Sequence, residues 1–387
     1  MIGGGIGGAT VAKYLVTTSA KLDVTLVEPK QKYTTCFFSN LYLAGVRSLE
    51  SLTHDYETLT KAYGVNVIHD AAAAIDPVAK TVTLVGGNKL VYDRAVVAPG
   101  IAFKYDGIEG YDQAATQTIP HAWNAGPQTE LLRRQLADME DGGLFIIVAP
   151  PNPFRCPPGP YERASLVAYY FKQFKPRAKI LILDAKDTFF EQDLFEDGWN
   201  RHYPGMIEWL PAQFTGGIKS VDVKTRTIRT AGETFNASVA NVIPAQIAGE
   251  LAQRVGVADQ SGWCPVNPIT FESKLLPGIH VVGDATDAGD MPKSAFVANS
   301  QAKACAFAIA AALTGSEQSA PHLFNTCFTL LAPNDAVSDA INLRPVAGSI
   351  KITDIFFSQI GESDEVRRQA AHQAEGWYAA FTHDVFG

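Results

Sequence analysis

The 387-residue sequence contains only five cysteines, and none of them forms a C-x-x-C motif. This spacing is typical of local redox dithiols and of zinc sites, and C-x-x-C-H is the motif that attaches a c-type haem. The absence of these motifs excludes a c-type haem carried by this chain, and no metal site is expected. Clusters of lysine and arginine are also missing, and the net charge is −8. A nucleic-acid-binding surface, which needs a basic patch, is therefore excluded.

Long hydrophobic runs are missing as well. Although 47% of the residues are hydrophobic, we find no run that approaches the roughly 20 apolar residues of a membrane span. We therefore expect no membrane span. The length and composition are typical of two or three domains with large cores.

Glycine is missing at one position where a nicotinamide-binding fold needs it. After the apolar run 144–148, the segment 149–160 reads A-P-P-N-P-F-R-C-P-P-G-P, and a helix-like run follows over 161–174. Proline has no N–H group to offer to a pyrophosphate. The segment predicts a strand–loop–helix unit that has lost its nucleotide, with Cys156 in the vacated place.

A complete glycine-rich loop lies at the N-terminus. The G-x-G-x-x-G glycines are Gly3, Gly5 and Gly8. Residues 9–16 continue as a helix, and residues 24–27 read as a buried strand that ends at Glu28. In a dinucleotide-binding unit, such glycines admit the pyrophosphate and the acidic residue binds the adenosine ribose. Because only two residues precede Gly3, the chain is expected to begin inside a longer precursor.

A second nucleotide-binding signal lies far downstream. Residues 275–285 read L-L-P-G-I-H-V-V-G-D-A, which predicts a buried strand with Asp284 at its carboxyl end, where ligands of open parallel sheets bind. This G-D-A signature resembles the second FAD motif of the disulfide reductase superfamily. The run from Ala98 to Gly100, after a strand at 94–97, resembles the exit from the FAD domain of that superfamily, and 243–245 resembles the return. Together these signals favour FAD in the first site.

The expected fold class is α/β, with two Rossmann-like, doubly wound domains of the disulfide reductase type and a C-terminal cap or interface domain. We expect an FAD-binding domain at 1–110 and 244–316, a domain that has lost nucleotide binding at 111–243, and the C-terminal domain at 317–387. The residues 179–184 predict a strand and the residues 302–313 an apolar helix. The last block carries aromatic residues and few strand–turn signals.

Two of the cysteines have settings that favour chemistry. Cys156 follows Arg155 near a helix N-terminus, and a cation and helix N-terminal N–H groups both stabilise a thiolate. Cys156 and Cys327 are therefore candidate nucleophiles or disulfide partners, although the sequence leaves their pairing open. Cys264 and Cys305 are interpreted as structural.

Over essentially its whole length, the chain resembles the flavoprotein subunits of flavocytochrome c sulfide dehydrogenase, relatives of sulfide:quinone oxidoreductase. The resemblance is carried by residues 3–8, 33–40, 153–162 and 283–293 and by Cys327. It implies that Cys36 is joined by a thioether to the 8α-methyl group of FAD. It also implies that Cys156 and Cys327 form a redox-active disulfide over the flavin ring.

The chemistry implied by this resemblance is oxidation of sulfide with a cytochrome c as electron acceptor. Hydrosulfide attacks the disulfide as in thiol exchange, with Cys156 as the persulfide carrier and Cys327 on the flavin side. Two electrons pass to FAD, and sulfur leaves as zero-valent sulfur or polysulfide. Glu162 is a candidate proton acceptor if burial raises its pKa, or else a helix first-turn residue. Lys293 is expected near flavin N1 and the C2 carbonyl, or else at the surface.

The resemblance further implies a heterodimer with a c-type cytochrome subunit that holds the haem. Aromatic residues of the C-terminal block are candidates for its docking surface, or equally for the core: Phe356, Phe357, Trp377, Tyr378 and Phe381. The family is exported to the bacterial periplasm, which suits a persistent disulfide. The signal peptide is not present in this sequence.

Two other functions are compatible with the same residues. A sulfide:quinone oxidoreductase needs a membrane-facing anchor, but residues 364–368 mix charges of both signs and do not form a basic amphipathic helix. A non-catalytic flavin-binding interaction protein is the other alternative. An NADH-dependent disulfide reductase is disfavoured by the proline-filled second loop.

Overall fold

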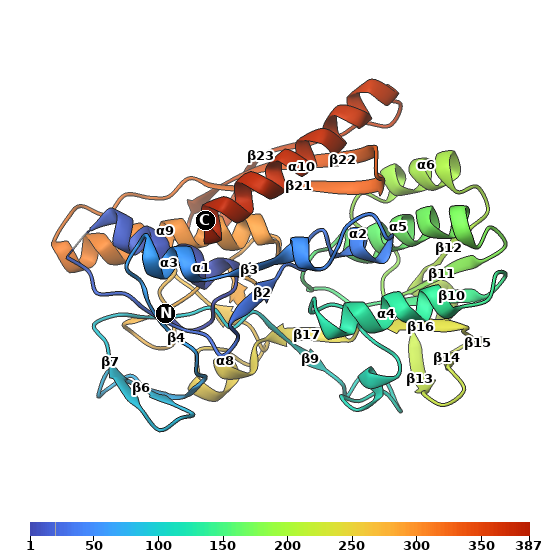
Figure 1. Cartoon of the computed structure of the whole chain (residues 1–387). Helices are drawn as coiled ribbons and strands as arrows, with labels where there is room; N and C mark the ends of the chain where they lie inside the picture. The colour runs from blue at the N-terminus through green and yellow to red at the C-terminus, as the bar shows by residue number, and fades with distance from the viewer. Residues whose placement is uncertain (20) are drawn as a thin grey trace.

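Both ends of the chain contribute to one parallel sheet. The structure is a computed structural model that describes residues 1–19 and 21–387. The strands of this sheet are β1 (Thr25–Val27), β4 (Asn66–Ile68), β8 (Ala95–Val97) and β19 (Ile279–Val281). Ile2 bridges Val27 and Val97 and so joins the pair β1–β4 to the pair β8–β19. One of the two lobes in Figure 1 is built around this sheet.

Two long helices, α1 (Ile6–Thr18) and α9 (Ala295–Thr314), lie side by side in this lobe. Both are rich in alanine and other small or apolar residues, which allows close packing on the sheet and on each other. The smaller elements of the lobe are β2 (Lys32–Thr34), a 3-10 turn (Glu50–Leu52), β3 (Thr53–Asp55), α3 (Glu57–Lys61), β5 (Ala72–Asp76), β6 (Thr81–Leu84), β7 (Lys89–Val91), α8 (Glu250–Val255), β18 (Cys264–Pro265) and β20 (Thr286–Asp287). The short helix α2 (Ser39–Leu43), which follows β2, packs on the second lobe (Figure 1).

The second lobe contains a four-stranded parallel sheet in the order β12-β11-β10-β16. Its elements are a 3-10 turn (Ala115–Gln117), α4 (Pro127–Asp138), β10 (Leu144–Ala149), α5 (Gly159–Phe174), β11 (Lys179–Asp184), α6 (Gln192–His202), β12 (Ile207–Leu210), α7 (Ala212–Thr215), β13 (Ile218–Asp222), β14 (Thr227–Thr230), β15 (Thr234–Asn236) and β16 (Val239–Val242). The apolar runs of β10 and β11 are buried almost throughout, as in parallel strands covered on both faces. The predicted strand–loop–helix scaffold is present as β10, the proline-rich loop and α5.

Two antiparallel strands connect the lobes. β9 (Ile101–Lys104) leaves the first sheet and pairs with β17 (Ala245–Ala248), which returns to it. β9 directly follows the predicted exit at 98–100. β17 begins at residue 245, the last residue of the predicted return at 243–245. The structure is therefore the α/β arrangement of two doubly wound units that the sequence predicts.

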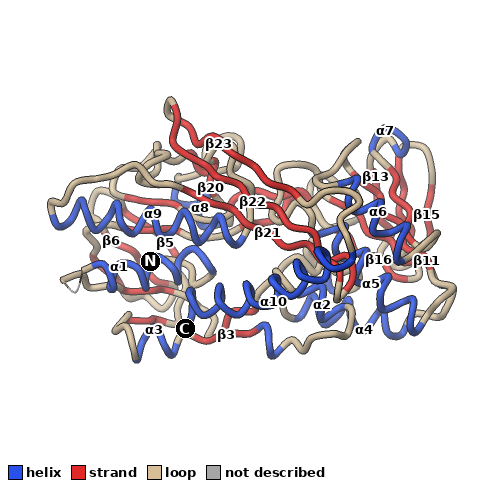
Figure 2. The backbone as a smooth tube through the Cα atoms, turned by 90° about the horizontal axis from the view of Figure 1, so that it is seen from above, coloured by secondary structure: helices blue, strands red, loops and turns tan. Residues whose placement is uncertain are grey.

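The C-terminal block forms a long antiparallel sheet followed by a helix. Its elements are β21 (Leu323–Ala332), β22 (Asp335–Val346), β23 (Ser349–Phe357) and α10 (Asp364–Phe386). The strands run from the α9 side of the molecule to the α6 side (Figure 2). The expectation of few strand signals was wrong, because buried polar residues such as Asn325, Thr329 and Asp339 interrupt the hydrophobic alternation that marks a strand.

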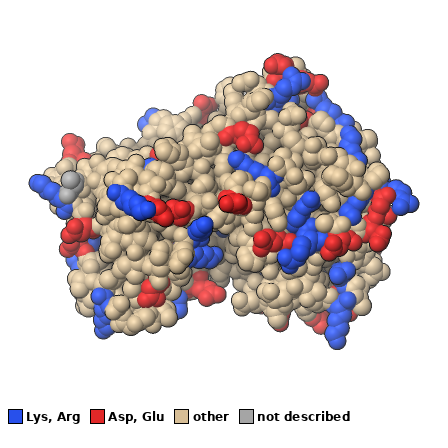
Figure 3. Space-filling model, in the orientation of Figure 1, with Lys and Arg blue, Asp and Glu red and all other residues tan. Residues whose placement is uncertain are grey.

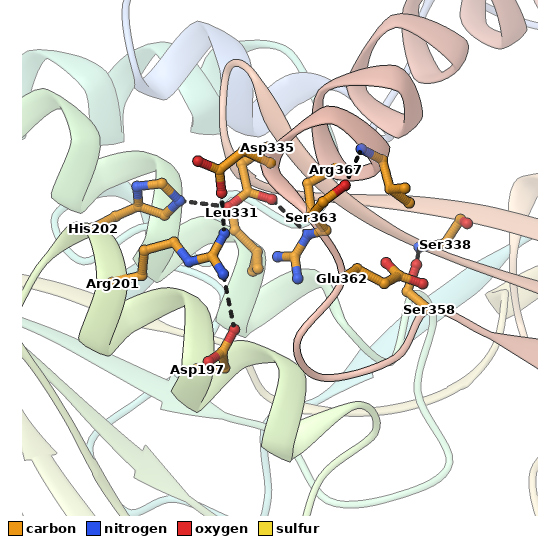
Figure 4. A network of polar contacts seen from close by, with 12 residues as sticks. Asp197, Arg201, His202, Leu331, Asp335, Ser338, Ser358, Glu362, Ser363 and Arg367 are labelled. Carbon is orange, nitrogen blue, oxygen red and sulfur yellow. Dashed lines mark hydrogen bonds and ion pairs between the residues drawn. The ribbon is translucent and has the colours of Figure 1, made fainter.

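A polar network ties the C-terminal block to the second lobe. His202 of α6 and Arg367 of α10 both point toward Asp335 of β22 (Figure 4), with Nε2–Oδ2 and Nε–Oδ1 distances of 2.5 and 2.6 Å. Burial raises the pKa of the Asp335 carboxyl, but the hydrogen bond from His202 and the charge of Arg367 lower it below its ordinary value. The ionised carboxylate therefore anchors two elements from different parts of the chain.

Within the described residues, α9 is the one helix that is long and apolar enough to cross a membrane. The expectation that no apolar segment approaches this length overlooked α9, because Asn299, Gln301 and Lys303 interrupt its apolar run. Of its most apolar window, 67% is buried inside the protein. This burial is typical of a core helix.

Candidate functional site

A cavity of about 710 Å³ lies where the two lobes and the C-terminal block meet. Most of the site residues expected from the sequence line it: Gly3, Gly5, Glu28, Cys36, Ala98, Gly100, Cys156, Glu162, Asp284 and Cys327. Gly8 and Lys293 are not among its described lining residues. The face shown in Figure 3 is hollowed between the lobes and carries interspersed acidic and basic side chains.

The glycine-rich loop is folded so tightly that side chains would not fit. Gly3 has a φ of +97°, and a Cβ atom there would lie 2.3 Å from the Ala98 carbonyl oxygen. A Cβ atom on Gly8 would lie 1.8 Å from the Gly3 carbonyl oxygen. No described side chain caps α1, so the N–H groups of its first turn remain available to an anionic group. This loop has the shape that a dinucleotide pyrophosphate requires.

Glu28 stands at the carboxyl end of β1, on the cavity wall. Its Oε2 accepts a hydrogen bond of 2.7 Å from the Gly4 N–H group, and its Oε1 accepts one of 2.9 Å from Lys30. Each carboxylate oxygen has two lone pairs, so the side chain can still accept hydrogen bonds from ribose hydroxyls. Glu28 thus both holds the loop and fits the predicted ribose contact.

Asp284 lies on the cavity wall after β19, with its Oδ2 3.8 Å from a guanidinium nitrogen of Arg155. Burial raises the pKa of this carboxyl, while the charges of Arg155 and Lys293 oppose the shift. The Arg155 guanidinium also donates to the Trp123 carbonyl and, at 2.9 Å, to Asn124 Oδ1. Asp284 therefore faces the cavity from the carboxyl edge of the first sheet, as predicted.

Cys36 lies between β2 and α2 with a free thiol. Its carbonyl oxygen accepts hydrogen bonds from the N–H group and the Oγ of Ser39, at 3.1 and 2.6 Å. The neighbouring Phe37 and Phe38 pack against aromatic residues of α10, including Tyr378. These contacts place Cys36 on the cavity wall.

Cys156 and Cys327 reach the same cavity from distant parts of the chain. Cys156 precedes α5, has a φ of +60°, and donates its N–H group to the Lys293 carbonyl at 2.8 Å. Cys327 lies in the middle of β21. Both thiols are free in this structure. Both residues line the cavity.

Arg155 favours a Cys156 thiolate, as expected, but in the protein alone other groups outweigh its charge. Burial raises the pKa of Cys156 well above its ordinary value, and the nearby Glu162 carboxylate raises it further. Arg155 opposes this shift without overcoming it. Burial also raises the pKa of the Cys327 thiol, and the charge of Asp339 raises it further. Both thiols therefore need a proton acceptor before they can react as thiolates.

Glu162 lies in the first turn of α5 and is held by two donors. Its Oε2 accepts from Asn40 Nδ2 at 2.7 Å, and its Oε1 accepts from the Leu330 N–H group of β21 at 3.1 Å. Burial raises the pKa of this carboxyl, although both hydrogen bonds oppose the shift. The raised pKa and the position on the cavity wall are the properties that a proton acceptor needs.

Lys293 does not extend its ammonium group into the cavity. The Nζ atom donates to the carbonyl oxygens of Asp284 and Thr286, both at 2.8 Å, and lies 3.6 Å from the ring centre of Trp263. Burial lowers the pKa of Lys293 to about 8. Backbone carbonyls and an aromatic ring hold the side chain in a buried place, so the surface position that was the alternative is wrong, and a position near flavin N1 stays a prediction.

The structure places further residues on the cavity wall whose part in the site the sequence did not reveal. Asp339, Asn325 and Trp377 line it, and the Trp377 Nε1 atom has no hydrogen-bond partner among the described residues. Only strand register and helix packing bring these side chains to the cavity, so no local motif marks them.

The aromatic residues proposed for a docking surface divide into two groups. Tyr378 and Phe381 are buried in the core, and Trp377 is partly buried against Phe37 and Phe328. Phe356 of β23 is 74% exposed. Phe357 is half-buried and its ring packs against Phe190, so Phe356 is the most exposed of the five candidates.

Family profiles match three parts of the chain. The profile of the pyridine nucleotide-disulphide oxidoreductases matches residues 1–134. The profile of the central part of the sulfide dehydrogenase [flavocytochrome c] flavoprotein chain matches 129–244, and that of the flavin-binding part of flavocytochrome c sulphide dehydrogenase matches 319–386. Together these ranges contain the glycine-rich loop, Cys36, Cys156 and Cys327.

Individual proteins show the same relationship. The chain is 22% identical over 320 residues to the mitochondrial sulfide:quinone oxidoreductase of Mus musculus, covering 77% of this chain and 67% of that protein. It is 55% identical over 40 residues to the sulfide dehydrogenase [flavocytochrome c] flavoprotein chain of Chlorobaculum thiosulfatiphilum, covering 10% of this chain and 83% of that sequence. The solved sulfide:quinone oxidoreductase of Aquifex aeolicus has the same fold, with a TM-score of 0.78 at 18% identity, covering 100% of this chain and 90% of that one.

The fold, the glycine-rich loop and the profile matches agree with one another. They confirm the predicted α/β fold of the disulfide reductase type and a flavin as the cofactor. The chain belongs to the superfamily of flavoproteins that includes the flavocytochrome c sulfide dehydrogenase flavoprotein chains and the sulfide:quinone oxidoreductases.

Proposed function

We propose that this flavoprotein is the sulfide-oxidising subunit of a flavocytochrome c sulfide dehydrogenase. The observation that carries the proposal is the meeting of Cys156 and Cys327 in one cavity, beside Cys36 and Glu162. A pair of sulfurs next to a flavin site is the arrangement that disulfide-based sulfide oxidation needs. The family profiles and the names of the relatives support the same substrate.

The residues of the cavity fit FAD. The glycine-rich loop and the first turn of α1 would hold its pyrophosphate, Glu28 its adenosine ribose and Asp284 its ribityl chain. The Cys36 thiol would form the thioether to the 8α-methyl group. When bound, FAD supplies the two-electron acceptor for the sulfur atoms.

The sulfur chemistry begins with a disulfide between Cys156 and Cys327. Glu162 accepts the proton that hydrogen sulfide loses on becoming hydrosulfide. Hydrosulfide forms a bond to the Cys156 sulfur, the Cys156–Cys327 bond breaks, and Cys327 takes the electron pair. A second hydrosulfide removes the outer sulfur of the Cys156 persulfide as disulfane and leaves Cys156 as a thiolate.

The cycle closes when the two cysteine sulfurs form their bond again. This step releases two electrons to the bound cofactor, so that two hydrosulfides give one hydrogen disulfide anion, one proton and two electrons. Further attack on such products yields longer polysulfides or zero-valent sulfur. In this scheme Cys327 is the sulfur on the flavin side and Cys156 is the persulfide carrier.

The electrons then pass to a c-type cytochrome subunit in a heterodimer. Ile352 and Ile355 of β23 line the cavity and are partly exposed, and the apolar side chains of Phe356 and Ile360 that follow along the chain are exposed as well. An exposed apolar group next to a redox site suits a docked electron-transfer partner. The proposed disulfide would persist in an oxidising compartment, which supports export to the periplasm.

Sulfide is expected to bleach the flavin absorbance of the anaerobic protein, because the Cys156–Cys327 pair passes two electrons to FAD. The reduced flavin should then be reoxidised at least tenfold faster by cytochrome c than by a soluble quinone. Absorbance after rapid mixing measures both steps. Faster reoxidation by quinone would instead identify a sulfide:quinone oxidoreductase, the function named for the mouse and Aquifex relatives. Absence of bleaching by sulfide would leave a flavin-binding protein without this activity, and bleaching by NADH would identify a pyridine nucleotide enzyme.

The tryptic peptide that contains Cys36 is expected to carry the mass of FAD. The thiol lines the cavity and has no disulfide partner, so it is free to form the thioether. Peptide mass spectrometry checks this expectation, and Cys36→Ala should yield protein whose flavin is released completely by acid precipitation. Cys264→Ala is the control, because Cys264 is buried in β18 and is not among the described residues that line the cavity. A bare Cys36 peptide from flavin-containing protein would contradict covalent attachment.

A further inference from the structure

Asp339 lies directly opposite Cys327 in the C-terminal sheet. The antiparallel register of β21 and β22 pairs these two residues. Side chains of directly opposed residues project from the same face, with Cβ atoms about 4.5–5.5 Å apart. Both side chains line the cavity, and Asp339 is only 3% exposed. A buried carboxyl group therefore faces the sulfur that we place on the flavin side.

An amide group fixes the geometry between the carboxyl and the sulfur. Asn325, two residues before Cys327 on the same face of β21, donates its Nδ2 to Asp339 Oδ1 at 2.8 Å and lies 3.9 Å from Cys327 Sγ. The Oδ1 of Asn325 accepts from Ser294 Oγ at 2.6 Å, and Ser294 caps the N-terminus of α9. The amide is therefore oriented by a helix cap, and its donor end is directed at Asp339.

Among the described residues, no cationic side chain pairs with the Asp339 carboxyl. From β21 it faces Cys327 and Asn325, and its opposite residue on β23 is the uncharged Phe357. Glu191 lies directly before α6, and its carboxyl interacts with Asp339, with Glu162 and with Arg367 of α10. Burial raises the pKa of Asp339 to about 7, and burial together with the charge of Asp339 raises that of Glu191 to about 8.

We propose that Asp339 is the proton acceptor for the Cys327 thiol. The thiolate that leaves the disulfide takes up a proton from water, because burial raises the pKa of the Cys327 thiol. Before the bond to Cys156 forms again, the S–H bond of Cys327 breaks, the proton bonds to a carboxylate oxygen of Asp339, and the electron pair stays on sulfur as a thiolate. The role rests on the proposed function, because the thiolate is the form that can bond to Cys156 again. Glu162 serves the incoming substrate on the Cys156 side, so each sulfur has its own carboxyl group.

The proposal predicts that Asp339→Asn changes two rates in opposite directions: the alkylation of Cys327 and the reduction of the flavin. Removal of a negative charge beside Cys327 lowers the pKa of its thiol, so iodoacetamide should alkylate Cys327 of the reduced protein about tenfold faster at pH 8. Loss of the proton acceptor should slow reduction of the flavin by about 100-fold, the scale of a general base. A residue that acted only through its charge would make both reactions faster.

The pH profile supplies the second readout. Asp339 accepts a proton only when ionised, so the rate of flavin reduction in the native protein should rise with pH through about 7. This rise should be absent in Asp339→Asn and displaced in Asp339→Glu, which retains a carboxyl group. The matched control is Asp354→Asn, an exposed carboxylate on the neighbouring strand β23, which should retain the native profile.

Rates are measured by rapid mixing of the oxidised holoprotein with sulfide and, separately, with dithiothreitol. Dithiothreitol reduces the cysteine pair without sulfide, so the proton step at Cys327 is tested even if sulfide is not the substrate. If dithiothreitol gives a pH profile that depends on Asp339 but sulfide does not reduce the flavin, the role of Asp339 is supported and sulfide oxidation is refuted. An unchanged or faster reduction in Asp339→Asn, or a pH profile equal to the native one, would overturn the proposal. If Asp339→Asn loses its flavin, Asp339→Glu decides the question, and a native profile in that variant counts against Asp339.

Discussion

Alanine in place of Cys327 is expected to slow reduction of the flavin by sulfide at least about a thousandfold. Without the Cys327 sulfur, Cys156 has no disulfide for hydrosulfide to attack, so the reaction loses its first bond-breaking step. Cys156→Ala should cause a loss of the same size, and the double variant should be no slower than either single variant. Such non-additivity is expected of groups that act as a unit. Anaerobic rapid mixing with the flavin absorbance as signal measures these rates.

The matched control for this experiment is Cys305→Ala. Cys305 is buried in α9 and is not among the described residues that line the cavity, so its variant removes a sulfur from another place. Its rate should remain within about threefold of the native rate. The flavin content of every variant must be compared, since a rate has meaning only for loaded protein. Rapid sulfide-dependent bleaching in both Cys327→Ala and Cys156→Ala would refute the disulfide mechanism.

Alanine in place of Gly8 is expected to yield protein without bound flavin. The added Cβ atom would lie 1.8 Å from the carbonyl oxygen of Gly3, so the turn that holds the pyrophosphate must open. Gly3 itself has a φ of +97° and lies against the Ala98 carbonyl, so the loop has little freedom to move. We expect flavin affinity to fall by at least about a hundredfold, as measured by the ratio of flavin to protein absorbance after gel filtration.

Gly376→Ala is the matched control for the loop variant. Gly376 lies within α10, and a Cβ atom there would meet no other atom within 4 Å. Alanine is favoured over glycine inside a helix by about 1 kcal/mol, so this variant should keep its flavin and a native or higher melting temperature. Normal flavin content in folded Gly8→Ala would show that the loop is not the pyrophosphate site.

Local patterns predicted the parts of the fold that depend on neighbouring residues. The strand predicted at 179–184 is β11, and the helix predicted at 161–174 is α5, which begins two residues earlier. The glycine spacing and Glu28 predicted the dinucleotide unit, because a tight turn and a strand end are set within about 30 residues. The resemblance to a flavoprotein family supplied Cys36 and the pairing of Cys156 with Cys327.

Other features followed from contacts between distant segments. The raised pKa values of Cys156 and Cys327 come from burial, which the local sequence around Arg155 did not reveal. The burial of Lys293 against the carbonyls of Asp284 and Thr286 likewise could not be read from its motif. The C-terminal strands were missed because their polar residues face a cavity that exists only after the lobes meet.

The sequence by itself determined the fold class and the flavin-binding loop, since the loop depends on glycines at fixed positions in one short segment. The tertiary structure alone decided which side chains surround the sulfurs. Asp339 faces Cys327 because of the register between two strands, and Glu162 meets the cavity because α5 packs on β21. Register and packing arise from the burial of whole faces, so no local motif encodes them.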